Sequence, residues 1–273
     1  MEQNTRQNDF LATAPIGKLL FRLSLPAVIA QLVNAFYNIV DRVYIGHIPG
    51  IGKLALTGVG VCMPLIFVVS AFAALVALGG APQATIAMGR KDFKYAERIL
   101  GNCVSLLVII SIVLTAVLLL WCKPLLLFFG ASENTIPYAA PYMRIYGAGT
   151  LFVQLALGLN AFISAQGFTK TSMYSILVGA VLNIVLDPVF IFLLDMGVQG
   201  AALATVISQA VSAGWMLWFL LSDHTILRIK KDCLPIRWKI LRPCIALGLS
   251  PFIMQSTESA IAICFNSCLL YTS

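Results

Sequence analysis

Charged residues are scarce in this sequence. They make up 11% of its 273 residues, whereas 60% are hydrophobic, and the mean hydropathy is +0.92. About a quarter of the residues in soluble domains are charged, so this composition excludes an ordinary soluble core. In hydrocarbon every backbone N–H and C=O must be bonded internally, which leaves helices and closed barrels as spanning structures. The apolar runs are about 20 residues long rather than alternating segments of about 10, so we predict an all-α polytopic membrane protein.

Motifs for metal binding and catalysis are also missing. Two histidines occur, His47 and His224, and both fall between apolar runs without an HExxH pattern. The seven cysteines contain no CxxC pair and lie mostly in or at the ends of apolar runs, which disfavours a metal cluster or a disulfide framework. No Gly-x-Ser-x-Gly elbow occurs within a run. We therefore expect neither an enzyme nor a bound cofactor.

The excess of basic residues, 18 Lys and Arg against 11 Asp and Glu, does not indicate nucleic acid as a partner. These residues cluster in short segments between apolar runs, and no nucleic-acid-binding motif accompanies them. A cytoplasmic N-terminus places 14 of the 18 inside, and the four outside are Arg42, Lys53, Lys123 and Arg144. This split satisfies the positive-inside rule, and the opposite orientation would reverse it. The chain is predicted to lie in a lipid bilayer with its N-terminus in the cytoplasm.

The apolar runs predict seven helical spans. They lie near residues 18–41, 55–79, 99–121, 141–164, 173–194 and 200–221, with a seventh from 244 to the end. A shorter apolar piece, 125–129, is expected in the membrane interface. This pattern divides the chain into a cytoplasmic N-terminus (1–17), a six-helix N-lobe (18–222), a cytoplasmic inter-lobe loop (223–243) and a truncated first helix of a C-lobe (244–273).

The first and seventh spans share a short sequence pattern. Leu23-Ser-Leu-Pro26 is followed by Asp41 fifteen residues after its proline, and Leu247-Gly-Leu-Ser-Pro251 is followed by Asn266 at the same distance. An offset of six spans returns the chain to the same side of the membrane, so this echo predicts two halves of parallel topology. A chance recurrence around two prolines is the alternative. If the echo is a repeat, the chain is a fragment of a longer protein with two such halves, and its last few residues need not be native.

Acidic residues inside apolar runs are the candidate functional groups. A charge at the bilayer centre costs about 2.5 kcal/mol or more and persists where it faces the protein interior or a water-filled path. Asp41 ends the first run, Asp187 lies inside the fifth, and Glu258 lies in the seventh with too little sequence after it to interpret. Asn183 is four residues before Asp187, so the two share one face of a helix.

Pro188 follows Asp187 directly and is expected to disrupt the helix near the carbonyl of Ile184. Carboxylate, amide and freed carbonyl oxygens suit a hard cation such as Na⁺, and a carboxylate shielded from water also takes up H⁺ readily. Two simpler interpretations stay open: Asp41 as a solvated acid paired with Arg42, and Asp187 as a helix-end cap. Pro26 is either a kink that lets the first helix bend or a tolerated membrane proline.

Several segments resemble the multidrug and toxic compound extrusion (MATE) transporters, in particular the prokaryotic branch related to DinF proteins. The segments that carry the resemblance are Leu25-Pro26, Asn34-Ala-Phe-Tyr-Asn-Ile-Val-Asp-Arg-Val-Tyr-Ile-Gly46, Ala165-Gln-Gly167, Asn183-Ile-Val-Leu-Asp-Pro188, Gly200-Ala-Ala-Leu-Ala-Thr205 and Leu249-Ser-Pro251. They occur over nearly the whole chain in the order and spacing of that family.

The resemblance implies a two-lobe, 12-helix antiporter of the prokaryotic inner or plasma membrane. Such a protein exports organic cations or other small amphipathic compounds against a Na⁺ or H⁺ gradient. It also implies a cation site, substrate-cavity positions and a kinking proline. They map onto Asp41, Asn183, Asp187 and Thr205 for the cation, Tyr37, Tyr142 and Asn160 for the cavity, and Pro26 for the kink. The C-lobe of the same protein would be the missing partner.

Two other transport functions are alternatives to export. A lipid-precursor or polysaccharide flippase is expected to line its cavity with Arg or Lys for a pyrophosphate, but here these residues are almost confined to the segments between spans. A channel is also compatible with the composition. Helices broken by proline and a sequence repeat fit a transporter better than a pore.

Overall fold

The computed structural model describes the backbone of residues 16–272, and side chains for residues 17, 20, 21 and 24–264. The described residues form helices and connections without a strand. The helices are α2 (Ile16–Gly46), α3 (Gly52–Gly89), α4 (Phe93–Leu120), α5 (Cys122–Phe128), α6 (Ile136–Ala148), α7 (Thr150–Ala165), α8 (Thr169–Pro188), the π-helix η1 (Val189–Leu193), α9 (Val198–Leu221), the 3₁₀-helix η2 (Lys231–Cys233) and α10 (Trp238–Thr272). This confirms the predicted all-α class. The predicted segment 1–17 falls almost entirely outside the described residues.

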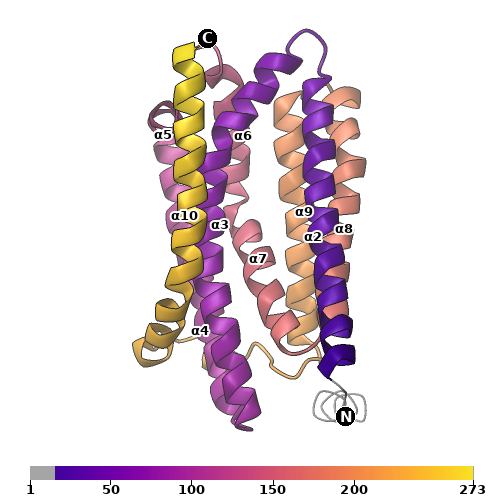
Figure 1. The fold of residues 1–273 in the computed structure, drawn as a ribbon, viewed down its shortest axis with the longest axis vertical. Coiled ribbons are helices and arrows are strands. Elements are labelled where there is room, and N and C mark those ends of the chain that lie inside the picture. The colour runs from indigo at the N-terminus through magenta and orange to yellow at the C-terminus, as the bar shows by residue number, and fades with distance from the viewer. Residues whose placement is uncertain (1–15, 273) are drawn as a thin grey trace.

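Each predicted span corresponds to a helix or a pair of helices. Within the described residues, four helices are long and apolar enough to cross a membrane by themselves: α3, α4, α8 with its π-helical extension, and α9. A fifth span is the bent pair α6 and α7. Helices α2 and α10, each of which includes residues outside the described side chains, run alongside the others over the height of the bundle (Figure 1).

The span predicted as one helix at 141–164 is in fact broken. Helices α6 and α7 meet at Gly149 with a bend of 58°. A side chain at Gly149 would collide with Val206 of α9, so glycine lets α9 approach the break closely. The break was missed because apolar residues continue on both sides of it, although Gly147 and Gly149 are a recognised signal for a kink.

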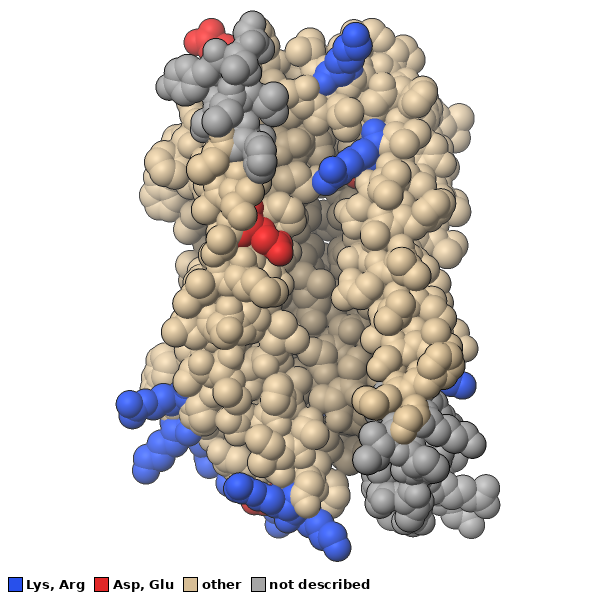
Figure 2. Space-filling model, viewed as in Figure 1, with Lys and Arg blue, Asp and Glu red and all other residues tan. Residues whose placement is uncertain are grey.

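The bundle has two groups of helices (Figure 1). Helices α2, α8 and α9 form one group and α3, α4 and α10 the other, with the oblique α7 between them. One hydrophobic cluster includes Ile99, Leu100 and Phe162, near the end where α4 begins, and a second includes Ile45, Leu126 and Met143 near the opposite end. Figure 2 shows a furrow between the two groups, with most visible Lys and Arg side chains gathered at the lower end.

Helix α10 packs along α3 through glycine contacts. Added side chains at Gly79 or Gly248 would collide with the backbone at Cys244 or Leu75, respectively, so the two helices approach closely here. Further along, the hydroxyl of Ser259 donates a hydrogen bond to the carbonyl of Pro64 at 2.9 Å. Small residues and interhelical hydrogen bonds are the usual means of helix association in membranes.

Helix α10 starts at Trp238, six residues before the predicted seventh span and inside the segment 223–243 that was predicted to be a loop. Helices α2 and α10 both run from the lower to the upper end of the bundle (Figure 1), which agrees with the parallel topology inferred from the sequence echo. The side chain of Asn266, the echo of Asp41, lies outside the described side chains.

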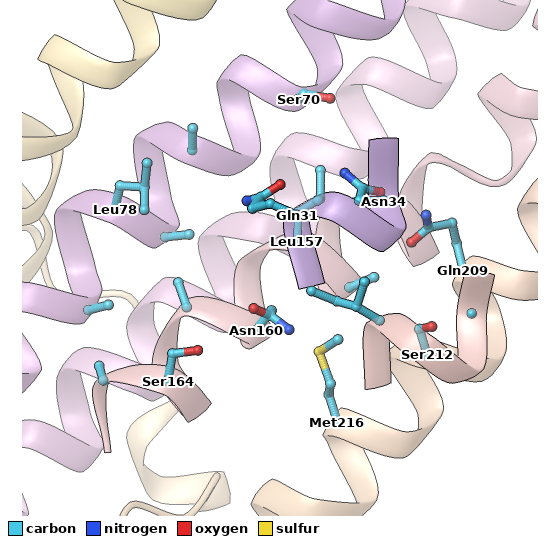
Figure 3. Close-up of a pocket in the computed structure, with 18 of the residues that line it drawn as sticks. Gln31, Asn34, Ser70, Leu78, Leu157, Asn160, Ser164, Gln209, Ser212 and Met216 are labelled. Atoms are coloured by element: carbon cyan, nitrogen blue, oxygen red, sulfur yellow. The ribbon is translucent and has the colours of Figure 1, made fainter. Parts of the chain in front are cut away.

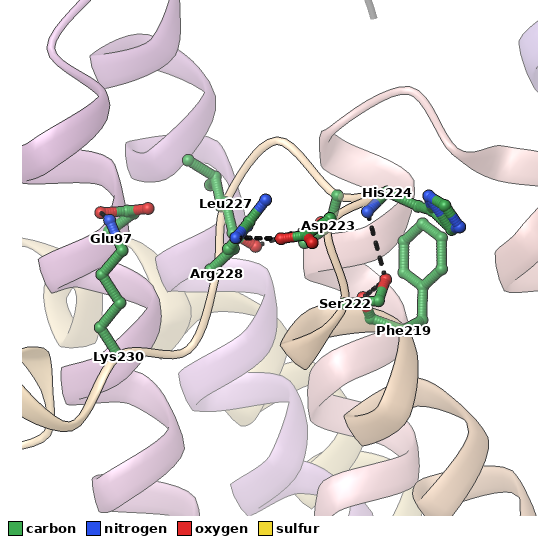
Figure 4. A network of polar contacts seen from close by, with 9 residues as sticks. Glu97, Phe219, Ser222, Asp223, His224, Leu227, Arg228 and Lys230 are labelled. Carbon is green, nitrogen blue, oxygen red and sulfur yellow. Dashed lines mark hydrogen bonds and ion pairs between the residues drawn. The ribbon is translucent and has the colours of Figure 1, made fainter. Parts of the chain in front are cut away.

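The connection from α9 to α10 is fastened to the helix ends rather than extended into solvent. Glu97 at the start of α4 pairs with Lys230 at 2.6 Å, and Arg228 pairs with Asp223 (Figure 4). Buried Gln166, just after α7, uses its Oε1 to accept hydrogen bonds from the backbone N–H groups of Ile226 at 3.0 Å and Leu227 at 2.8 Å. The chain leaving α9 is therefore held in one path across the ends of α4 and α7.

Candidate cation and substrate site

Four polar side chains from three helices meet near the upper ends of α2 and α8. Asn183 donates hydrogen bonds from Nδ2 to Oδ1 of Asp187 at 3.3 Å and to the hydroxyl of Thr205 at 3.4 Å. The carboxyl groups of Asp41 on α2 and Asp187 on α8 lie close enough to interact electrostatically. The structure thus brings together all four residues expected to bind a cation.

The oxygens of this cluster are buried and only partly engaged. Asp41, Asn183 and Asp187 are 8%, 1% and 0% exposed. Asp41 Oδ1, Asn183 Oδ1 and Asp187 Oδ2 have no hydrogen-bond partner among the described residues. A buried acceptor without a partner is costly, and two carboxylates in contact repel each other unless a proton or metal cation lies between them. The donor set fits Na⁺, which takes oxygen ligands, and it equally fits a shared proton.

Both simpler interpretations of the acids are wrong. Asp41 is not a solvated partner of Arg42, because it is buried and Arg42 instead points its Nη2 at the sulfur of Met63, 3.5 Å away. Asp187 is not a helix-end cap, since it lies within α8 and accepts its hydrogen bond from the side chain of Asn183. Within the described part of the chain, no group of three or more His, Cys, Asp or Glu residues that could hold a metal ion is present.

The helix geometry near Pro188 differs from the expectation. Helix α8 remains α-helical through Ile184 and Pro188, and the irregular part is the π-helix that follows, Val189–Leu193. The change comes after the proline rather than at the i−4 carbonyl. Single π-helical turns are rare and often occur at functional sites. Here the π-turn directly follows Asp187 and carries α8 to the turn before α9.

A cavity of about 870 Å³ lies between the helices (Figure 3). Its lining includes Tyr37 and Asn160, two of the three positions expected to contact substrate. Tyr142, the third, is 3% exposed, belongs to the upper hydrophobic cluster and stacks on Tyr146 with ring centroids 6.5 Å apart. Tyr142 is therefore packed in the core and is not among the residues that line this cavity.

Asn183 and Thr205 line this cavity as well as belonging to the acid cluster. Asp41 and Asp187 are not part of the lining. The acid pair therefore lies behind an amide and a hydroxyl that separate it from the cavity. Any ion or proton that changes the hydrogen bonds of Asn183 or Thr205 changes the cavity wall at the same time.

The cavity lining combines small apolar residues with neutral polar groups. Amide and hydroxyl side chains point into the space from opposite sides, among them Gln31 and Asn34 on α2, Asn160 and Ser164 on α7, and Gln209 and Ser212 on α9 (Figure 3). Within the described residues no Lys, Arg, Asp or Glu lines it. Such a surface can accept an amphipathic molecule, with apolar contact over most of its area and a few hydrogen bonds.

Several lining residues were not predicted, although the sequence contains a signal for some of them. Gln31, Asn34 and Tyr37 recur every three residues on α2, and Thr205, Ser208 and Ser212 recur at helical spacing on α9. Polar stripes of this kind inside apolar helices mark faces turned away from lipid. Gln255 of α10 also lines the cavity, and no local sequence pattern identifies it.

Pro26 lies inside α2, and its side chain is buried. The helix is assigned without a break from Ile16 to Gly46. Three cavity residues, Gln31, Asn34 and Tyr37, lie between Pro26 and Asp41. At 1.5 Å per residue the proline and the acid are about 22 Å apart along the helix. A bend at Pro26 would therefore displace the part of α2 that forms the cavity wall.

The fold and this site define a helical membrane protein of the transporter class. The family model described as MatE matches residues 26–189, and the chain belongs to that family. Its members are transporters rather than enzymes, and they are multi-pass proteins of the cell membrane. The MATE family expected from the sequence motifs is thereby confirmed.

Individual relatives agree with this assignment. The multidrug export protein MepA of Staphylococcus haemolyticus (strain JCSC1435) is 26% identical over 246 residues, which are 90% of this chain and 54% of that protein. The solved structure of the MATE multidrug transporter DinF-BH in complex with R6G is 33% identical, with a TM-score of 0.89. That match covers 96% of this chain and 58% of DinF-BH. An inward-facing multidrug resistance MATE transporter is 27% identical with a TM-score of 0.80, covering 91% of this chain and 56% of the other.

The chain spans about half the length of the curated relatives it matches. The described helices correspond to one six-helix lobe and the helix that follows it. Activity, substrates and partners of a whole transporter are therefore proposals for this chain.

Proposed function

We propose that this chain forms the N-lobe of a cation-coupled antiporter that exports drugs, organic cations or other amphipathic compounds by alternating access. Asp41, Asn183, Asp187 and Thr205 bind the coupling ion, Na⁺ or H⁺. The cavity lined by Tyr37 and Asn160 receives the exported compound. The observation that carries the proposal is that Asn183 and Thr205 belong both to the acid cluster and to the cavity wall.

The coupling step follows from the helices to which the ligands belong. A cation between Asp41 and Asp187 would tie α2 to α8, since it relieves the repulsion of the two carboxylates. Loss of the cation would let α2 move relative to α8, and α2 carries cavity residues between Pro26 and Asp41. The ion needs only a differential affinity of a few kcal/mol for the two positions of α2 to exchange with the drug. One charge crossing 100 mV supplies about 2.3 kcal/mol toward this.

The orientation assigned to the protein is N-terminus in the cytoplasm. The starts of α2, α4, α8 and α10 lie at one end of the bundle, which also carries most visible Lys and Arg (Figures 1 and 2). The 14-to-4 distribution of basic residues supports assigning this end to the cytoplasm. The furrow and cavity then lie between the two sides of the membrane.

The uncharged cavity lining argues against the flippase alternative. Recognition of a pyrophosphate requires Arg or Lys donors, and the lining offers amides and hydroxyls among alanine and leucine side chains. These groups suit apolar or cationic compounds whose charge is delocalised. No observation favours the flippase over drug export.

The test is efflux from proteoliposomes that contain the product of the whole gene encoding this chain. Na⁺ and pH gradients are imposed separately, and a fluorescent organic cation reports transport. We expect Asp41→Asn and Asp187→Asn each to abolish gradient-driven efflux while the protein still inserts. Asp195→Asn is the matched control, because Asp195 is exposed in the turn between α8 and α9 and outside the cluster. Wild-type efflux in either site variant would overturn the ion assignment.

A binding measurement tests the ion site independently of transport. The 273-residue chain is titrated with Na⁺ at constant ionic strength, with K⁺ as the balancing cation. Its thermal unfolding temperature is measured at each Na⁺ concentration. Ligand that binds only the folded state raises the unfolding temperature. A shift in the wild type and Asp195→Asn that is absent in Asp187→Asn supports Na⁺ as the ion. A pH-driven efflux without any Na⁺ shift assigns H⁺ instead.

A further inference from the structure

A basic surface lies at the end of the bundle proposed to face the cytoplasm. It is formed by two segments far apart in sequence, the first turns of α4 and the connection into α10. The cationic side chains that define it are all exposed: Lys94, Arg98, Lys231, Arg237, Lys239 and Arg242. We call these six residues the basic surface.

The two segments are fixed to each other by buried hydrogen bonds. Asn102 of α4, 1% exposed, donates from Nδ2 to the carbonyl of Cys233 at 3.1 Å and accepts at Oδ1 from the backbone N–H of Arg237 at 2.6 Å. A side chain at Gly101 would collide with the backbone of Cys233, so the connection lies directly against α4. The ion pair between Lys230 and Glu97 closes the same junction (Figure 4). The basic side chains are therefore held on one preformed surface.

Few acids neutralise this surface. The two ion pairs among the described residues engage Arg228 and Lys230, neither of which belongs to the basic surface. Glu97 is taken up by Lys230, and Asp92 caps α4 by accepting from the backbone N–H of Tyr95 at 3.0 Å. Asp232 is exposed beside Lys231. Six cations thus face solvent with Asp232 as the one neighbouring acid that is not engaged elsewhere among the described residues, and the surface carries a strong excess of positive charge.

Exposed apolar side chains lie beside these charges. Trp238, the first residue of α10, is 69% exposed, Phe93 at the start of α4 is 43% exposed, and Ile236 is 38% exposed. Beyond them α4 and α10 continue into their apolar stretches. Aromatic residues at this level are typical of the membrane–water interface, and adjacent Lys and Arg side chains reach the phosphate groups there.

We propose that the basic surface binds the headgroups of anionic phospholipids, with Trp238 and Phe93 against the acyl-chain boundary. The positive-inside rule accounts for the side on which basic residues lie. That rule does not require two segments far apart in sequence to be held together by hydrogen bonds beside exposed aromatic residues. The site goes beyond the transport function, although it uses the proposed orientation of this end. A basic cluster at the cytoplasmic end of a membrane helix attracts anionic lipid by about 1 kcal/mol, or roughly fivefold, per Lys or Arg.

The experiment measures lipid retained by the 273-residue chain in neutral detergent. Phosphatidylglycerol or phosphatidylcholine of the same acyl chains is titrated, and bound lipid is counted by native mass spectrometry. The double variant Arg98→Gln/Lys239→Gln removes one charge from each segment of the surface. The matched control Lys53→Gln/Lys170→Gln removes the same charge from exposed positions elsewhere. Circular dichroism compares helix content, and Arg237→Gln/Arg242→Gln replaces the first double variant if that protein loses helicity.

We expect the wild type and the control to bind phosphatidylglycerol more tightly than phosphatidylcholine. The surface variant should lose affinity for phosphatidylglycerol by about tenfold or more. Equal binding of the two lipids, or equal loss in the surface and control variants, would overturn the proposal. Displacement of phosphatidylglycerol by millimolar inorganic phosphate would also overturn it, because the site would then take a free anion. So would failure of the wild type to bind either lipid, as expected if a second copy or a further chain segment covers this face.

Discussion

Asn183 donates a hydrogen bond to Asp187 one helical turn away, at 3.3 Å, while its own side chain also lines the cavity. The amide is thus the physical link between a buried acid and the space proposed for substrate. Its remaining oxygen, Oδ1, has no partner among the described residues and is free to accept from an ion or a protonated carboxyl group. A residue in this position should influence ion and drug together.

We predict that Asn183→Ala weakens cation binding and drug binding in parallel. The substitution removes the unpartnered Oδ1 as an oxygen ligand for Na⁺ and one cavity-lining amide, and an interaction with a charged group contributes about 1.5–3 kcal/mol. We therefore expect a loss of about tenfold or more in apparent Na⁺ affinity, with a smaller loss for the drug. Asn160→Ala is the comparison, because Asn160 lines the cavity but hydrogen-bonds to Ser172 and not to the acids. The coupling idea fails if Asn183→Ala changes drug affinity alone.

The role of the Thr205 hydroxyl in cation binding can be tested with a substitution that conserves the shape of the side chain. Its hydroxyl accepts from Asn183 at 3.4 Å, and valine has nearly the same volume without the oxygen. Thr205→Val should reduce cation affinity by about tenfold, consistent with the loss of about 1–1.5 kcal/mol from one hydrogen-bonding group. Thr205→Ser keeps the oxygen and should remain within about twofold of the wild type. Ion titration followed by thermal unfolding distinguishes them, and equal behaviour of the two variants would remove Thr205 from the site.

Much of the site could be predicted because an acid inside a membrane helix is costly and persists where it faces the protein interior or a water-filled path. Asp41 and Asp187 stood out against long apolar runs, and the spacing of Asn183 from Asp187 fixed their shared face. Their mutual contact across α2 and α8 could not be derived from spacing, since it depends on how two distant helices pack. The family motifs supplied Thr205, which an isolated threonine in an apolar helix would not have revealed.

Helix geometry, like helix packing, could be predicted only in part from the sequence. Span positions followed from hydropathy, but hydropathy does not report direction changes within a span. The break at Gly149 and the π-turn after Pro188 both place side chains differently from a straight helix. Tyr142 illustrates this limit: its sequence position matches a cavity residue, and it lies in the packed core. The start of α10 at Trp238 was missed because basic residues interrupt the apolar run there.

Gly248 should be essential for the attachment of α10 to α3. A Cβ atom there would meet the backbone at Leu75, which cannot move aside like a flexible side chain. Gly248→Ala should therefore destabilise the protein by about 1–3 kcal/mol through overpacking. The control is Gly60→Ala in α3, where an added Cβ meets nothing within 4 Å and alanine favours the helix. Thermal unfolding in detergent measures both. A Gly248→Ala protein as stable as Gly60→Ala would contradict the close approach of the two helices.

Gln166 should control whether the connection between α9 and α10 stays on the bundle. Its Oε1 accepts from the backbone N–H groups of Ile226 and Leu227 and from the Thr225 hydroxyl, the last at 2.7 Å. Gln166→Leu leaves these buried donors without their acceptor, at about 1–3 kcal/mol for each unsatisfied group. The connection should detach locally, since that opening costs less than unfolding the helices. Limited trypsin digestion checks this, because Arg228 lies directly after the released segment.

Cleavage at the connection should be at least tenfold faster in Gln166→Leu than in the wild type, given the lost stabilisation. Gln209→Leu is the matched control, since Gln209 lies on α9 in the cavity lining and makes no side-chain hydrogen bond within the described part of the protein. If both variants are cut at the wild-type rate, Gln166 does not hold the connection in place. If both are cut equally fast, the effect comes from general loosening of the bundle. Selective cleavage of Gln166→Leu alone requires that one buried amide fastens the segment carrying the basic surface.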